Sequence, residues 1–186
     1  MMTEISLNVL DVAENSTRAK ASLVTVTVAA DTASDSLKIS IADDGCGMDA
    51  EQVKRVTDPF FTTRTTRKVG LGVPFFKMAC ESTGGSFDIV SEPGIGTTVT
   101  ALFVISHIDR MPLGDMCTTM HNLIVFHPDT DFIYRYSYDG DSFVLDTREM
   151  REILDGVPLD NPEVSAYIRE YLRENTNEIN AGKPLL

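Results

Sequence analysis

Four polar side chains recur at helical spacing near the amino terminus. They are Asn8, Asp11, Asn15 and Arg18. Steps of three, four and three residues place them on one face of a helix predicted over residues 3–19. An acid, an amide and a guanidinium in a row could coordinate a metal–phosphate complex and position a water molecule. A solvated polar stripe has the same spacing, so this pattern does not identify a site by itself.

A glycine-containing segment follows the second predicted strand. Residues 43–48 read Asp-Asp-Gly-Cys-Gly-Met. The glycines let the chain turn sharply and approach a ligand, and the Asp43 carboxylate can accept a hydrogen bond from an exocyclic amine. An acidic surface turn is the alternative interpretation. The acidic spacing of an EF-hand loop is absent, which excludes that kind of calcium site.

A second glycine pair, in residues 70–72 (Gly-Leu-Gly), directly precedes another predicted helix. Free backbone amides at a helix N-terminus can hold a phosphate. The segment lacks the third glycine of a dinucleotide-binding fingerprint, because Phe75 occupies that place, and it lacks the Gly-Lys-Ser/Thr of a Walker loop. A helix-entry turn is the alternative. Three basic side chains in the preceding loop would attract anions: Arg64, Arg67 and Lys68.

The net charge excludes some classes of partner. The 186 residues carry 16 basic and 28 acidic side chains, a formal net charge of −12 at pH 7. Phosphate backbones and anionic lipids repel such a chain. We therefore expect that the protein binds no nucleic acid and no membrane.

The cysteines and the apolar runs indicate a compartment. Three cysteines with irregular spacing form neither a disulfide framework nor a zinc pattern. Reduced thiols are typical of the cytoplasm. The sequence shows no signal peptide and no apolar run of membrane-spanning length. We therefore expect a soluble, cytoplasmic protein.

Periodicity and composition divide the chain after residue 106. The first part is predicted to contain strands at 22–30, 36–43, 86–91 and 97–105, with further helices ending at residue 56 and running from 73 to the Gly84-Gly85 pair. Residues 107–186 are predicted to contain an antiparallel meander of strands at 123–126, 132–138 and 142–145, then helices at 147–154 and 162–179. The first part holds 9 basic and 13 acidic side chains and the second holds 7 and 15. Residues 107–186 therefore form an acidic C-terminal extension.

The order of the segments is more specific than any one of them. Along the chain come residues 11–19 (DVAENSTRA), 43–47 (DDGCG), 58–64 (DPFFTTR), 70–72 (GLG) and 94–97 (GIGT). In this order they resemble the ATP-binding domain of the GHKL superfamily, shared by DNA gyrase, the Hsp90 chaperone, histidine kinases and MutL. The resemblance covers about residues 3–106. It implies an α+β fold, a two-layer α/β sandwich of the Bergerat type whose mixed sheet has helices on one face, here followed by a small C-terminal β-meander and helices.

The resemblance implies which residues would hold the adenine of ATP. Asp43 would accept a hydrogen bond from the adenine amino group. Thr97 would support the base through its hydroxyl and a water molecule. Gly45 and Gly47 would shape the adenine pocket, with Met48 against the base.

It also implies how the phosphates and Mg²⁺ would be held. Asn15 would coordinate the magnesium that bridges the phosphates, and Arg18 matches a position where kinases often carry a basic phosphate contact. Backbone amides would come from Gly70, Leu71 and Gly72. A lid over the nucleotide would include Phe60, Thr63 and Arg64. Asp11 falls where the ATPase branch has a glutamate general base, and its side chain is one methylene shorter.

Two classes of function follow from the resemblance. As an enzyme, the protein would bind Mg-ATP and either hydrolyse it slowly, with Asp11 as base, or transfer phosphate to a partner protein in signalling, as histidine and anti-sigma kinases do. As a non-catalytic module, it would use ATP to order the lid while residues 107–186 contact a protein partner. Residues 107–113 (HIDRMPL) resemble a histidine kinase phosphoacceptor box. They follow the ATP-binding part instead of preceding it, so a loop after the last strand is the preferred interpretation.

Overall fold

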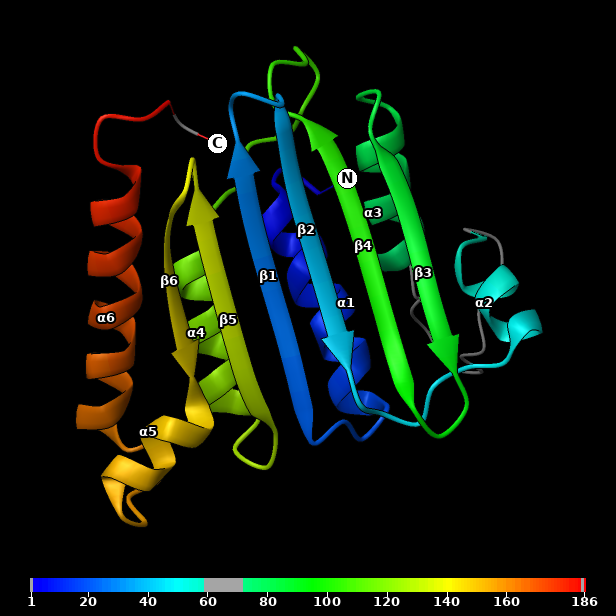
Figure 1. Ribbon diagram of the computed structural model, residues 1–186. Coiled ribbons are helices and arrows are strands. Elements are labelled where there is room, and N and C mark those ends of the chain that lie inside the picture. Colours follow the sequence, from blue (N-terminus) through cyan, green and yellow to red (C-terminus); the bar gives the residue numbers. More distant parts are fainter. Residues whose placement is uncertain (1, 59–71, 185) are drawn as a thin grey trace.

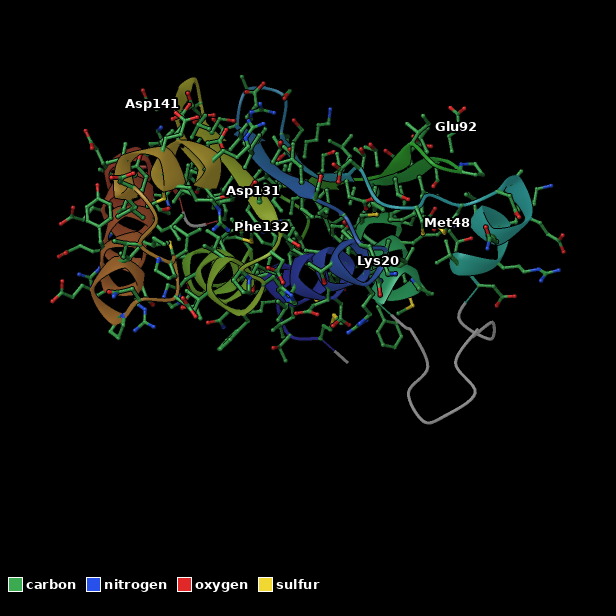
Figure 2. All side chains as sticks on the ribbon, turned by 90° about the horizontal axis from the view of Figure 1, so that it is seen from below. Lys20, Met48, Glu92, Asp131, Phe132 and Asp141 are labelled. Atoms are coloured by element: carbon green, nitrogen blue, oxygen red, sulfur yellow. The ribbon has the colours of Figure 1, made fainter. Side chains whose placement is uncertain are left out.

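The computed structural model, shown in Figure 1, describes residues 2–58, 72–184 and 186. The strands in those residues are β1 (Leu23–Asp31), β2 (Ser36–Asp43), β3 (Ser86–Glu92), β4 (Gly96–Val104), β5 (Asp131–Tyr138) and β6 (Asp141–Asp146). The helices there are α1 (Ile5–Arg18), α2 (Ala50–Val56), α3 (Gly72–Glu81), α4 (Met116–Phe126), α5 (Thr147–Leu154) and α6 (Pro162–Asn180). Figure 2 looks along the strands and shows α1 and α4 as a second layer on one side of the sheet. The predicted α+β architecture is confirmed.

The six strands form one mixed sheet in the order β3-β4-β2-β1-β5-β6. Four neighbouring pairs are antiparallel, and β1 with β5 is parallel. It follows that β4 and β5 run in the same direction, although they are consecutive along the chain. A tight turn cannot join two such strands, so the chain must cross over one face of the sheet. The helix α4 makes this crossover (Figure 1).

The prediction of a strand at residues 123–126 is wrong, because these residues form the end of α4. The helix begins after Asp115, whose carboxylate accepts a hydrogen bond from the Thr118 backbone amide (2.8 Å). Its last turns bury Leu123 and Ile124 in the core. A short apolar run fits a buried strand and a buried helix end equally well, and the crossover requirement decides between them here.

The core lies between the helices and one face of the sheet. Along β1 the valines Val24, Val26 and Val28 are buried, while Thr25 and Thr27 on the opposite face are partly exposed. This alternation is the period-two pattern of a strand with one covered face. The predicted helices on one face of a mixed sheet are therefore observed.

The acidic extension continues the same sheet. Its strand β5 pairs with β1 from Leu23↔Asp131 to Ala30↔Tyr138. Its last helix, α6, covers the edge strand β6, and the Tyr171 hydroxyl donates to the Val144 carbonyl (3.4 Å). Covering the edge protects a row of backbone groups that could otherwise pair with another chain. Residues 107–186 thus supply two strands, the crossover helix and an edge cover.

Residues 107–113 form a loop after β4, as the sequence indicated. The Arg110 side chain donates to the carbonyls of Ile105 (2.9 Å) and Met111 (3.0 Å). The His107 Nδ1 atom accepts from the Asp109 backbone amide (3.2 Å). The histidine therefore sits in an irregular turn and not on a helix.

Candidate functional site

A cavity of about 480 Å³ opens between α1, α2 and the ends of β2, β3 and β4. Six residues that the sequence singled out line it: Asn15, Arg18, Asp43, Gly47, Met48 and Thr97. Figure 2 shows Met48 close to α2 and Lys20 close to the end of α1. The volume lies within the range of small-molecule sites.

The Asp43 carboxylate is held by three hydrogen bonds at the end of β2. Its Oδ2 atom accepts from the Ser16 hydroxyl on α1 (2.6 Å). Its Oδ1 atom accepts from the backbone amides of Gly45 (2.9 Å) and Thr97 (3.3 Å). A carboxylate has about four lone-pair positions, so one remains for a ligand donor. The group is thus an oriented acceptor that borders the cavity.

A chain of hydroxyl groups lies beside Asp43. Thr97 is its direct partner across β2 and β4 in the sheet register. The Thr97 hydroxyl is hydrogen-bonded to the Ser91 hydroxyl (2.8 Å), and Ser91 also donates to the Gly96 carbonyl (3.0 Å). The Met48 backbone amide donates to the same Ser91 oxygen (2.8 Å). Ser91 therefore fixes both the threonine and the methionine at the cavity wall.

The glycine segment after β2 is clamped between α1 and the β3–β4 turn. The Cys46 amide donates to the Ala19 carbonyl (3.0 Å), and the Cys46 carbonyl accepts from Gly94 (2.8 Å). Gly47 has φ +64°, and a Cβ atom there would lie 1.9 Å from the Glu92 carbonyl oxygen. Only glycine fits this backbone without displacement. The sequence and the packing agree on why the residue is glycine.

Apolar side chains make up the remaining wall of the cavity. They come from α1, α2, α3 and the three strands and suit an apolar ring. The residues include Val12, Ile41, Val56, Val73, Ile89 and Val99.

The polar end of α1 carries the cation side of the cavity. Arg18 donates to Asn15 Oδ1 (3.1 Å) and lies 3.7 Å from the Glu14 carboxylate. Glu14 also contacts His127 Nε2 (2.9 Å), at the end of the crossover helix α4. The C-terminal part of the chain therefore touches the network that orients Arg18. Arg55 on α2 adds a second cation to the cavity and pairs with Glu51.

Asp11, Gly45 and Gly72 border the site without lining the described part of the cavity. A Cβ atom on Gly72 would lie 2.8 Å from the Asp11 Cβ and 3.3 Å from its Oδ2. The Asp11 carboxylate thus faces the first residue of α3. Gly45 contributes its amide to Asp43 instead of a surface to the cavity.

The lid residues lie outside the described part of the chain. This applies to Phe60, Thr63, Arg64, Gly70 and Leu71, together with Arg67 and Lys68.

Sequence reasoning did not select three side chains that line or organise the cavity. Ser16 follows Asn15 within the helical motif, so its position was a usable signal. Ser91 is the register partner of Thr97 in the β3–β4 hairpin, and the strands predicted at 86–91 and 97–105 end and begin at these two residues. Arg55 had no signal in the sequence, because only packing brings α2 to the cavity.

These groups fit Mg-ATP. An oriented carboxylate acceptor and apolar walls suit an aminopurine ring. Two guanidinium groups suit the phosphates. The amide oxygen of Asn15 is the hard oxygen ligand that Mg²⁺ accepts beside phosphate oxygens and water. The donor set therefore contains a partner for each part of the ligand.

Comparison with known families decides the identity of this fold. Residues 1–107 match the family of histidine kinase-, DNA gyrase B- and HSP90-like ATPases. The chain belongs to this family. The match covers the helix, the strands and the glycine segment that build the cavity, so the cavity lies within the domain that gives the ATPase family its name.

Relatives of this ATPase domain include sensor kinases. The signal transduction histidine-protein kinase AtoS of Escherichia coli (strain K12) is 38% identical over 68 residues, which is 37% of this chain and 11% of that protein. The sensor histidine kinase ZraS of Klebsiella oxytoca is 39% identical over 64 residues, which is 34% of this chain and 14% of that protein. The chain therefore spans 11 to 14% of the length of these curated relatives.

A solved structure shares the fold beyond the ATPase domain. The crystal structure of the N-terminal domain of a DNA repair protein superposes with a TM-score of 0.57 at 14% identity, covering 78% of this chain and 53% of that one. That coverage exceeds residues 1–107, so the shared architecture reaches into the C-terminal part.

Within the described residues, none of the helices has the length and apolar character needed to cross a bilayer.

Proposed function

We propose that the protein binds Mg-ATP in the 480 Å³ cavity and uses it in signalling together with a protein partner. The observation that carries the proposal is the Asp43 carboxylate, which Ser16, Gly45 and Thr97 hold at the cavity with one acceptor position left. Such an acceptor pairs with the amino group of adenine and faces the carbonyl of guanine unfavourably. The site would thereby favour ATP over GTP.

The cation side of the cavity would hold the phosphates. Arg18 and Arg55 supply positive charge, and Asn15 supplies an amide oxygen to the magnesium ion. In the structure Asn15 Oδ1 accepts from Arg18. With Mg-ATP bound, this amide oxygen would serve as the magnesium ligand and the Arg18 guanidinium would be available to the phosphates. Bound magnesium would neutralise phosphate charge during phosphoryl transfer.

The proposed reaction is slow hydrolysis or transfer of phosphate to a partner protein. Asp11 lies one helical turn before Asn15 on α1 and would take the proton from the attacking water or hydroxyl group. Residues 107–186 would contact the partner. We place this activity in the cytoplasm, where the three free cysteines stay reduced.

A second candidate function is a non-catalytic, ATP-gated interaction module. It is favoured by the position of Asp11, which faces Gly72 and does not line the described part of the cavity. The Asp11 side chain is also one methylene shorter than that of glutamate. ATP would then act by ordering the lid, and it would not be hydrolysed or transferred.

Calorimetric titration with Mg-ATP tests nucleotide binding. The variant Asp43→Asn is expected to bind at least about tenfold more weakly, because its amide opposes the adenine amino group with a donor. Asp44→Asn is the matched control, since the Asp44 carboxylate bonds Ser22 and Leu23 instead of lining the cavity. This control should keep its affinity within about twofold. Undiminished affinity in Asp43→Asn would contradict the proposed adenine site.

Turnover separates the two candidate functions. Release of phosphate, or appearance of a phosphorylated protein, that Asp11→Ala abolishes while ATP binding persists would establish the enzyme. Binding without turnover and without phosphoprotein, in the presence of magnesium, would establish the gated module.

A further inference from the structure

A second cavity, of about 430 Å³, lies at the opposite edge of the sheet, between β6, α5 and α6. Its floor and walls are apolar, with Val144 on the edge strand, Ile153 on α5 and Tyr167 on α6. We call it the α5–α6 groove. The nucleotide cavity is formed at the β2, β3 and β4 side of the sheet, so the two sites do not overlap (Figure 1).

Large apolar side chains in this groove are exposed to an unusual degree. The exposed fraction is 83% for Ile153, 59% for Tyr167 and 50% for Val144. A single exposed apolar residue is ordinary on a soluble protein, but three that line one concave surface mark a binding site. Secondary structure holds all three, since β6, α5 and α6 carry them.

The border of the groove is acidic. Glu149 and Glu163 line it, and neither has an ion pair within the part of the chain that the structure describes. Two nearby cations are engaged in ion pairs, Arg148 with Asp146 (2.6 Å) and Arg151 with Asp131 (2.9 Å). A third, Arg135, is the cross-strand neighbour of Val144, against three carboxylates, Asp146, Glu149 and Glu163, that line the groove. The groove therefore offers apolar contact area within a negative field.

The charge of the border determines which occupant fits. A second copy of this chain, with a net charge of −12, would bring two acidic borders together at a cost in Coulomb energy. A partner with Lys and Arg around an apolar stripe gains from both the groove and its border. An amphipathic helix presents such a stripe at positions i, i+3, i+4 and i+7.

We infer that the α5–α6 groove is the partner-binding surface of this protein and that it receives a basic amphipathic helix of the partner. This inference deepens the proposed function, in which residues 107–186 contact a partner, and rests on it. Ile153 and Tyr167 anchor the apolar stripe of the helix, and Glu149 and Glu163 face its cationic flanks.

Fluorescence anisotropy with three synthetic peptides of about 18 residues tests this inference. One carries a leucine stripe with Lys and Arg flanks, one carries the same stripe with Glu flanks, and one is a scrambled form of the basic peptide. The basic amphipathic peptide should bind at least about tenfold more tightly than either of the others. Binding of the scrambled peptide with equal affinity would overturn the inference, because charge alone would then explain it.

Matched variants locate the binding. Ile153→Glu and Tyr167→Ser should each weaken the basic peptide at least about tenfold. Ile108→Glu, at a residue 94% exposed in the loop after β4, should leave affinity unchanged. Equal effects at Ile153 and Ile108 would overturn the inference, as would concentration-dependent dimerisation of the native chain that Ile153→Glu removes.

ATP titration of the same samples keeps the two proposals apart. Ile153→Glu should bind ATP like the native protein, and Asp43→Asn should bind the basic peptide like the native protein. Loss of peptide specificity with normal ATP binding would reject the groove alone. Loss of ATP binding in the native protein, with specific peptide binding intact, would reject the nucleotide site alone.

Discussion

The two ends of the sheet share a layered architecture and differ in the side chains that lie between the layers. At the β2, β3 and β4 side, residues such as Val99 and Ile89 leave a cavity of about 480 Å³ beneath α1 and α3. At the β5 and β6 side, Tyr134, Tyr136 and Phe143 pack against one another, with aromatic ring centroids 5.7 to 6.3 Å apart. Aliphatic side chains therefore line the first region, and aromatic rings pack in the second.

The hydrogen bonding of polar side chains also differs between the two ends of the sheet. Around the cavity, hydroxyl and carboxylate groups such as Ser16, Ser91 and Asp43 form a connected network. In the aromatic end, the Tyr134 hydroxyl is fully buried without a hydrogen-bond partner among the described residues, and burial raises the pKa of this phenol well above its usual range. In the proposed function the first arrangement orients the nucleotide, whereas the buried Tyr134 ring contributes packing.

Truncation of the aromatic end should give the largest effect. Tyr134→Ala removes a fully buried ring and is expected to lower the free energy of unfolding by about 3–5 kcal/mol. Tyr167→Ala, at an exposed ring, should cost less than about 1 kcal/mol. Urea denaturation followed by circular dichroism measures both. A loss for Tyr134→Ala no larger than for Tyr167→Ala would mean that this end is not a packed core.

Cysteine reactivity should distinguish the cavity wall from the core. Cys46 is exposed and lines the cavity, whereas burial raises the pKa of the Cys80 thiol to about 11. Near pH 8.5 Cys80 should have roughly a hundredfold less thiolate than a cysteine in an unfolded chain, and it gains reactivity only as the pH rises toward its pKa. Iodoacetamide labelling followed by mass spectrometry should modify Cys46 first, and Mg-ATP should slow that reaction. Labelling of Cys46 that ATP leaves unchanged would place the nucleotide elsewhere.

A large side chain introduced into the cavity should take the space that the nucleotide would occupy. Ile89→Trp places a large ring in the cavity and is expected to weaken ATP binding at least about tenfold. Val90→Trp is the control, because the next residue of β3 points to the opposite, exposed face. Calorimetry compares the two variants. Equal affinities would show that Ile89 is not in contact with the nucleotide.

Much of the fold could be predicted from the sequence, because local signals specify it. Apolar–polar alternation predicted β1 and β2, and the structure contains both strands. The prediction of a strand at residues 123–126 was wrong because the periodicity of so short a run does not indicate whether the chain crosses over the sheet as a helix there. The parallel β1–β5 pairing depends on contacts more than 100 residues apart, which no local pattern encodes.

The sequence could predict those candidate site residues that lie at the end of a strand. Asp43 and Thr97 occupy such positions and are direct neighbours in the sheet. The Ser16–Asp43 contact joins α1 to β2, and Arg55 reaches the cavity only through the packing of α2. No sequence motif indicated the α5–α6 groove. Its residues are of ordinary types, and only the solvent exposure of their apolar side chains is unusual.

Single hydroxyl deletions should give the smallest effects and test the aromatic end in detail. The Tyr136 hydroxyl donates to Asn180 Oδ1 (2.7 Å), so Tyr136→Phe should cost about 1 kcal/mol of unfolding free energy. Tyr134→Phe removes a buried hydroxyl without a partner and should be neutral or stabilising. Urea denaturation of the two variants gives the comparison, and a larger loss for Tyr134→Phe would reveal a partner for that hydroxyl.

Nucleotide selectivity tests the central claim most directly. Competition of Mg-ATP against Mg-GTP for the native protein should favour ATP by about a hundredfold, because the Asp43 carboxylate pairs with an amino group and opposes a carbonyl. In Asp43→Asn the preference should shrink to a few fold, because an amide can donate as well as accept. Equal affinity of the native protein for ATP and GTP, or a preference that Asp43→Asn leaves unchanged, would contradict the account.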